Sequence, residues 1–168
     1  SGIGDIYIFG GTIDTTDIDT QITATNEWLY VYGGEINCRI HGWKGVTIGA
    51  GTVNAISNYA VIDSDGKIVI NGGEITARTT QLFEDSQHWA IEADGGFAIA
   101  TDMEIRASPE PYGTLGEYVA ENHETYDLIV VSENPIPIIY TVYFWLDSSD
   151  EYATSWDEVE AGQKATPP

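Results

Sequence analysis

The sequence predicts an all-β fold, a parallel β-helix (β-solenoid) followed by a short C-terminal β segment. Three observations support this. A strand-glycine-strand pattern repeats along the chain, apolar and polar residues alternate with the period of a strand that buries one face, and the repeated segments are rich in β-branched and aromatic residues. Glycines interrupt these segments every few residues, which disfavours helices.

The repeat has three clear copies and two weaker ones. Residues 5–14, 28–37 and 67–76 each contain a strand, a Gly-Gly pair and a second short strand. Residues 45–54 keep one glycine of the pair, whereas residues 96–106 keep only the strand character and are one residue longer. Irregular spacing between copies fits a solenoid with loops of variable length. Aligned residues of the second strand recur at intervals of 23, 17, 22 and 30 residues: Ile13, Ile36, Val53, Ile75 and Ile105.

Each copy is expected to bury one face. The Gly-Gly pair should turn the chain between its two strands, because glycine accepts positive φ and close backbone approach. Stacked copies would then bury one continuous apolar column that no single copy could bury alone. The second strands should bury Ile13, Ile36, Val53 and Ile75. The first-strand residues that should point inward are Ile6, Ile8, Leu29, Val31, Val46, Ile48, Ile68 and Ile70.

The repeat predicts a β-solenoid domain over residues 1–131, with Leu128–Val131 as its last strand. Residues 132–139 contain two prolines and are expected to form a short stiff linker. Residues 140–168 hold another strand and an acidic patch, and we expect a partial β-repeat unit that belongs to a longer chain. An antiparallel β-sandwich is the alternative fold, because several short strands separated by turns would also suit it.

Composition argues against several classes of partner and site. With 6 Lys and Arg against 27 Asp and Glu, the net charge is -21, so nucleic acid and anionic membrane surfaces would be repelled. No apolar run approaches the roughly 20 residues of a membrane span, so membrane insertion is not expected. The single cysteine, Cys38, excludes an internal disulfide framework and is expected to face the core.

Aromatic residues on the predicted outer face form the candidate ligand-binding site. In the repeat register, Tyr7 and Tyr30 occupy equivalent positions on neighbouring copies, as do Phe9 and Tyr32, with Trp28 one step earlier. Rings spaced about 4.8 Å per copy would form a flat exposed patch on which pyranose rings could stack. The alternative is that the rings only stabilise the sheet or pack under a partner. Two further candidates lie in predicted loops: Trp43 and Trp89.

Acidic residues supply the metal candidates, and calcium is the one cofactor considered. Asp14, Asp17 and Asp19 cluster near glycines, while Asp63 and Asp65 belong to an Asp-x-Asp-Gly segment. Its glycine falls at position 4 rather than 6 of a calcium loop, so a turn with Asx hydrogen bonding explains Asp63 and Asp65 better.

A catalytic role is not predicted. A polysaccharide lyase needs a base beside metal-bound carboxylates, and a hydrolase needs two positioned carboxylates. No basic residue lies in a recognisable acidic signature, and pairs drawn from 27 acids carry little information. We expect no zinc site either, because His41, His88 and His123 lie far apart with no ligand-like partner two or four residues on. A β-helix lyase or hydrolase is the enzymatic alternative.

Two segments resemble known families. The Ile-x-Gly-Gly-(Glu/Thr)-Ile copies, and above all residues 59–77, resemble carbohydrate-binding domains built as right-handed β-helices in large surface proteins of anaerobic Gram-positive bacteria. The likeness covers roughly residues 5–131. Residues 140–144 and 159–168 resemble the opening half of the internalin-type β-repeat of Listeria and Bacteroides surface proteins, without its later aromatic-glycine segment.

Together the resemblances imply a right-handed solenoid in a modular bacterial protein that is secreted or attached to the cell wall. They also imply a noncatalytic carbohydrate-binding or adhesion module, with a polysaccharide or glycan and other domains of the same chain as partners. The competing function is a structural stalk without a ligand, whose acidic surface would serve solubility and spacing.

Overall fold

The described part of the protein is mostly β. The described residues of the computed structural model form strands and connecting segments, with no α-helix among them. The chain divides into two compact units, Ser1–Ile136 and Pro137–Pro168, and their boundary falls within the predicted linker. The structure describes residues 2–15, 17–80, 88–119, 125–133, 139–144 and 155–160.

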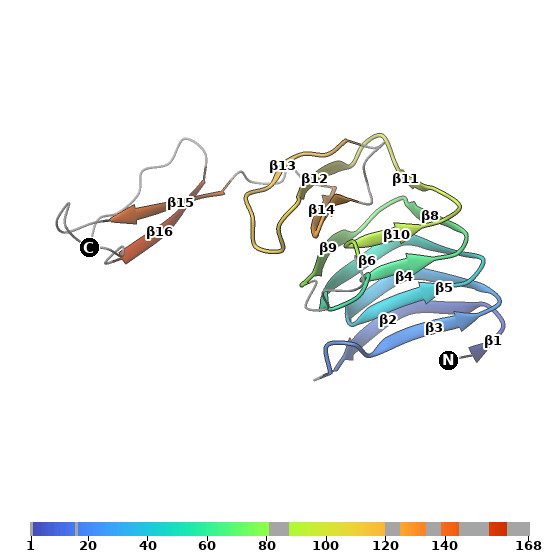
Figure 1. Ribbon diagram of the computed structural model, residues 1–168. Coiled ribbons are helices and arrows are strands. Elements are labelled where there is room, and N and C mark those ends of the chain that lie inside the picture. The colour runs from blue at the N-terminus through green and yellow to red at the C-terminus, as the bar shows by residue number, and fades with distance from the viewer. Residues whose placement is uncertain are drawn as a thin grey trace. The chain divides into compact units, whose positions relative to one another are not determined.

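Two sheets form the first unit (Figure 1). The chain alternates between them from one strand to the next over most of the repeat. The five-stranded sheet is parallel throughout, in the order β1 (Gly2–Ile3), β3 (Gln21–Thr25), β5 (Arg39–Gly42), β7 (Ile62–Ser64) and β10 (Ile91–Ala93).

The nine-stranded sheet is mixed. Strands β2, β4 and β6 pair in parallel, the two halves of β6 pair in parallel with β8 and β9, and β11 pairs in parallel with β8. Its members are β2 (Ile6–Asp14), β4 (Trp28–Asn37), β6 (Gly45–Ser57), β8 (Lys67–Ile70), β9 (Glu74–Thr79), β11 (Phe97–Ile99), β12 (Glu104–Ser108), β13 (Gly116–Glu117) and β14 (Leu128–Ser132).

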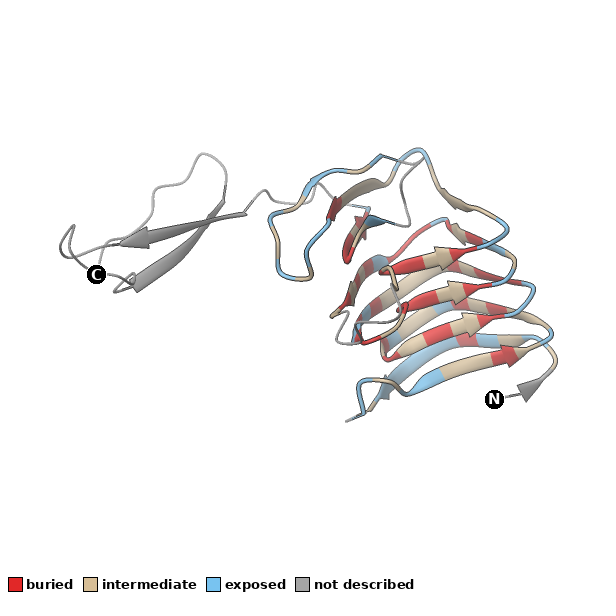
Figure 2. Ribbon diagram, viewed as in Figure 1, coloured by how far each residue is buried: buried red, intermediate tan, exposed pale blue. Residues whose placement is uncertain are grey.

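The copies of the repeat lie beside one another in the predicted register. Leu29 of β4 pairs with Ile6 of β2 and with Val46 of β6, and Ile36 pairs with Ile13. The inner faces of both sheets supply the core, as the alternating buried positions in Figure 2 show. Period-2 alternation therefore identified the buried face of the sheet correctly.

Most predicted core residues are buried, and Cys38 is buried with them, as expected. Burial raises the pKa of the Cys38 thiol. One prediction fails on β2, because Ile13 is 36% exposed, whereas Ile6 is half-buried and packs against the core as expected. Among the described strands β2 pairs with β4 alone, so no further strand covers its outer side. The predicted residues that are buried are Ile8, Leu29, Val31, Ile36, Val46, Ile48, Val53, Ile68, Ile70 and Ile75.

The glycine pairs produce bulges more often than breaks. In β2 and β4 the strand runs through the Gly-Gly pair with a shift of register, and β6 runs through its Gly-Ala-Gly in the same way. The fourth copy splits at its Gly-Gly pair into separate strands, β8 and β9, and the fifth copy, which lacks the pair, splits into β11 and β12. The second glycine of each group takes the positive φ that a residue with a side chain adopts rarely. These φ values are 87° at Gly11, 91° at Gly34, 94° at Gly51 and 92° at Gly73.

Strand β14 corrects the predicted direction of the last strand. It lies between β9 and β12 and runs antiparallel to both. Strand β12 of the fifth copy thus keeps the direction of β9 but is separated from it by one strand. The aligned column nevertheless continues, because Val131 pairs with Ile75 on one side and Ile105 on the other. The purely parallel stack is therefore wrong at this end, where the chain inserts a reversed apolar strand.

Tyr118 closes part of the core beside β11 and follows β13. Its ring meets Phe97 edge to face at 6.1 Å and lies 5.6 Å from the ring of Tyr126. Burial raises the pKa of Tyr118 to about 12, and the nearby Tyr126 makes a smaller contribution in the same direction.

Alkaline pH is therefore expected to destabilise the first unit. The unfolded chain releases the Tyr118 proton near pH 10 and the folded chain near pH 12, so the unfolded state binds fewer protons between these values. The free energy of unfolding should fall across that window by about 2 kcal/mol. Urea denaturation below pH 10 and near pH 12 measures the fall. Tyr118→Phe should reduce it, and an equally steep fall in this variant would contradict the assignment to Tyr118.

The second unit is described only by its two strands. Strands β15 (Ile139–Phe144) and β16 (Ser155–Glu160) pair antiparallel. Within the described part of the chain, no helix has the length and apolar character needed to cross a membrane.

Candidate functional site

Five predicted aromatic residues come together on the outer face of the nine-stranded sheet, on strands β2 and β4. The register pairs Tyr7 with Tyr30, and their ring centroids lie 4.8 Å apart. Alternation along the strands directs these rings away from the core that Ile8 and Val31 enter. We call this group the aromatic ladder: Tyr7, Phe9, Trp28, Tyr30 and Tyr32.

The ladder rings are stacked and do not lie side by side in one plane. The ring planes of Tyr7 and Tyr30 differ by 9°, and those of Phe9 and Tyr32 by 22° at 5.8 Å. Two coplanar rings could not approach to 4.8 Å, so the faces of Tyr7 and Tyr30 overlap with an offset. Paired strands lie about 4.8 Å apart, which sets this stacking distance. The expectation of a flat patch is therefore wrong: a ligand would meet outer ring faces and ring edges.

Exposure of the ladder is greatest at the edge of the sheet. Phe9 and Tyr7 on β2 are 73% and 51% exposed, and Tyr32 on β4 is 44% exposed. Trp28 and Tyr30 are half-buried between their neighbours. The ring surface open to a ligand therefore belongs mainly to β2 and to Tyr32.

Two glycines of β6 form the floor beside the ladder. A Cβ atom at Gly45 would collide with the Trp28 ring, and one at Gly49 would lie 3.0 Å from Cδ1 of Tyr32. The absence of side chains at these positions lets both rings lean over β6. Gly45 pairs with Trp28 in the sheet, so the repeat alignment contained this signal, although the sequence analysis did not use it.

Asp5 places a carboxylate at one end of the ladder, a position that the sequence analysis missed. Its Oδ1 accepts a hydrogen bond from the backbone N–H of Trp28 at 3.0 Å, and its Oδ2 accepts one from the Tyr7 hydroxyl at 3.3 Å. Partial desolvation and then the negative charge of Asp5 raise the pKa of Tyr7 and of Tyr30. The charge of Asp5 therefore acts on two ladder rings.

Trp43 and Trp89 do not join the ladder. Trp43 follows β5 of the five-stranded sheet, is 46% exposed and meets His41 edge to face at 6.2 Å. Trp89 precedes β10 of the same sheet and is half-buried, and its backbone N–H donates to Glu92 at 2.9 Å. The seven predicted aromatic residues thus lie on two different sheets.

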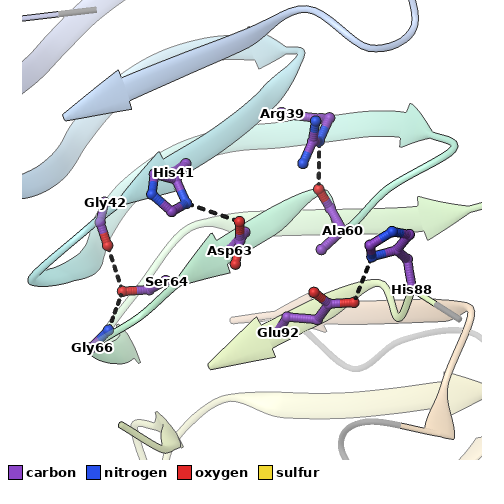
Figure 3. A network of polar contacts seen from close by, with 9 residues as sticks. All are labelled: Arg39, His41, Gly42, Ala60, Asp63, Ser64, Gly66, His88 and Glu92. Carbon is purple, nitrogen blue, oxygen red and sulfur yellow. Dashed lines mark hydrogen bonds and ion pairs between the residues drawn. The ribbon is translucent and has the colours of Figure 1, made fainter. Parts of the chain in front are cut away.

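Both histidines with described side chains contact a carboxylate on the five-stranded sheet (Figure 3). His41 Nδ1 lies 2.8 Å from Asp63 Oδ2, because the two residues are paired on β5 and β7. His88 Nδ1 lies 3.2 Å from Glu92 Oε1. Glu92 lies four residues after His88, so the expectation that no histidine has a partner at that spacing is wrong. His123 lies outside the described residues.

Several polar side chains of this sheet form hydrogen bonds to backbone groups of neighbouring segments. Arg39 Nε donates to the carbonyl of Ala60 at 2.7 Å, and its guanidinium lies 4.9 Å from the centre of the Tyr59 ring (Figure 3 shows the hydrogen bond). Burial lowers the pKa of Arg39, against the opposing effect of nearby acids. Ser64 Oγ donates to the Gly42 carbonyl at 2.6 Å and accepts from the N–H of Gly66 at 3.0 Å. These contacts tie neighbouring strands together.

The predicted metal candidates do not converge. Asp14 Oδ1 accepts from the Thr15 N–H, and Asp17 Oδ1 accepts from the Asp19 N–H. Asp19 accepts from the backbone N–H and side-chain amide of Asn58 at 3.3 and 3.2 Å.

Of the remaining two candidates, Asp65 lies in the predicted turn and Asp63 does not. Asp63 belongs to β7 and contacts His41, and the turn after β7 is closed by Ser64, so the Asx explanation is wrong for Asp63. Asp65 is exposed after β7. In the part of the chain that the structure describes, no three His, Cys, Asp or Glu side chains form a group that could hold a metal ion.

Comparisons with known proteins find no matching family model, curated protein or solved structure.

Proposed function

We propose that the first unit is a right-handed parallel β-helix that serves as a noncatalytic carbohydrate-binding or adhesion module. The module would belong to a larger protein that is secreted or attached to a bacterial cell wall, with other domains of the same chain as neighbours. The in-register parallel strands and the alternation of the chain between two sheets support the β-helix. The resemblances of the two segments support the cellular setting.

The observation that carries the binding function is the aromatic ladder. Its rings offer a large rigid apolar surface next to hydrogen-bonding groups. Because the rings are rigid, they lose little conformational entropy when a ligand binds. Pyranose rings have apolar C–H faces that contact aromatic rings favourably. The exposed rings of Phe9, Tyr7 and Tyr32 lie where an extended polymer could run along the sheet edge.

Replacing two exposed ladder rings is expected to abolish most of the binding without unfolding the protein. The double variant Phe9→Ala/Tyr32→Ala removes rings that are 73% and 44% exposed, so little core contact is lost. Loss of two stacking contacts should weaken glycan binding roughly tenfold or more. A glycan array and a pull-down with insoluble polysaccharides identify the ligand, and titration calorimetry measures the loss.

Tyr112→Ala is the matched control. Tyr112 is 74% exposed and lies between β12 and β13, outside the ladder, so its removal should leave binding unchanged. Circular dichroism should show that all variants stay folded. If the unaltered protein shows no saturable binding across a broad panel, the glycan-binding proposal fails and the stalk function is supported. Equal losses in Tyr112→Ala and in the ladder variant would show that binding does not use the ladder.

A further inference from the structure

The charges around the aromatic ladder discriminate among classes of glycan, and this inference rests on the proposed function. Carboxylates lie near both ends of its ring rows. Asp5 contacts the Trp28 backbone and the Tyr7 hydroxyl at one end, and the exposed Glu35 follows the rings on β4 at the other. Asn37 donates to Glu35 at 3.2 Å, which leaves the carboxylate charge in place. A ligand that lies along the rings passes between two negative charges.

Positive charge beside the ladder is scarce. Strands β2, β4 and β6 contain no lysine or arginine. Lys44 precedes β6, but its Nζ is held 2.6 Å from Glu27 Oε2, and this hydrogen bond raises the pKa of Lys44. Lys67 lies two strands away from Trp28, with Gly45 between them, at a separation of about 10 Å, where salt largely screens its charge. Among the described residues, an acidic sugar would find no free cation beside the rings.

A protonated amine, in contrast, would meet two attractive groups at once. An ammonium group beside Asp5 gains a charge-assisted hydrogen bond to the carboxylate. In the same position it lies near the Tyr7 hydroxyl, whose oxygen can also accept a hydrogen bond from the ammonium group. The net charge of -21 adds a long-range attraction for cationic ligands and a repulsion for anionic ones.

We propose that the aromatic ladder prefers glycans with free amino groups and rejects glycans with uronate or sulfate groups. The sugar ring would stack on the exposed faces of Phe9 and Tyr7, and its ammonium group would bind Asp5. The N-acetylated form of the same sugar keeps the stacking surface but lacks the positive charge. Such a ligand should therefore bind more weakly.

The test compares three oligosaccharides of similar length: a glucosamine oligomer, the corresponding N-acetylglucosamine oligomer and a galacturonate oligomer. Short oligomers limit nonspecific attraction to the acidic surface. We expect the glucosamine oligomer to bind roughly tenfold more tightly than its acetylated form, an advantage that added salt should reduce, and the galacturonate oligomer to bind least. Titration calorimetry at low and high salt measures these affinities.

Asp5→Asn removes the charge and keeps an oxygen that can accept from the Trp28 N–H. It should lower the ratio of the affinity for the glucosamine oligomer to the affinity for the acetylated oligomer several-fold. Asp65→Asn is the matched control, because it makes the same change of net charge at an exposed position in the turn between β7 and β8, outside the ladder. Equal effects of the two substitutions would show that the preference comes from overall charge, and would overturn the inference.

The other outcomes separate this inference from the proposed function. Equal or tighter binding of the acetylated or galacturonate oligomer overturns the amine preference, while the carbohydrate-binding function stands. If no oligomer binds and the broad panel also shows no binding, both proposals fail.

Discussion

Alanine in place of Gly34 is expected to destabilise the first unit by about 2–5 kcal/mol, the sum of two separate costs. A φ of 91° costs a residue with a Cβ atom about 1–2 kcal/mol. In addition, the new Cβ would lie 2.6 Å from the carbonyl oxygen of Gly11 on the neighbouring strand. Because this neighbour is backbone, relief requires the two strands to move apart, which costs about 1–3 kcal/mol.

Gly11→Ala separates the two costs. Gly11 has nearly the same φ, 87°, but nothing lies within 4 Å of its added Cβ, because β2 is at the edge of the sheet. This variant should lose only the conformational part, about 1–2 kcal/mol. Urea denaturation of the two variants measures the difference. If both variants lose the same stability, the close approach of the Gly11 backbone does not contribute to the cost of a side chain at position 34.

The second large effect is expected at Ile36. Its side chain is fully buried in the core, so Ile36→Ala removes apolar contacts and leaves a cavity that costs about 2–5 kcal/mol. Ile13 occupies the equivalent position one copy earlier and pairs with Ile36, but it is 36% exposed. Ile13→Ala should cost less, about 1 kcal/mol, because part of the removed surface already faces water and solvent can fill the space that the side chain leaves.

The two variants make the same substitution at equivalent positions of two copies. Strands lie on both sides of Ile36 but on only one described side of Ile13. Thermal melting or urea denaturation gives both values. A loss at Ile13 as large as that at Ile36 would mean that the outer side of β2 is covered in solution, by a second copy or by another segment.

Much of the fold could be predicted because its signal is local. Alternating residues identified the inner face, and the repeated glycines identified the copies, so the register of Leu29 with Val46 followed from alignment alone. What alignment lacks is the neighbourhood of each copy. Ile13 carries the same signal as Ile36, yet its burial depends on whether another strand lies beside β2. The insertion of β14 was likewise hidden, since an apolar strand fits a sheet in either direction.

The candidate site was predictable to the same extent. Equivalent positions in two copies were enough to bring Tyr7 beside Tyr30. The tilt of the rings could not be predicted, because stacking depends on the side-chain rotamers and on the space left by Gly45 and Gly49. Asp5 escaped notice because its role comes from a hydrogen bond to Trp28, 23 residues on, and a single acid among 27 has no distinguishing pattern.

The two ends of the nine-stranded sheet differ in how readily they can accept a further strand. Strand β2 offers nine residues to a newcomer, and no described strand pairs with its outer side. At the opposite end β11 has only three residues, and part of β12 is already paired with β13. Among the described edges of this sheet, β2 offers an incoming strand the longest template. If another β strand pairs with this sheet, we expect it to do so beside Phe9 and Tyr7, whether it comes from the same chain or from another. The added strand would then compete with a bound ligand for the same side of the molecule.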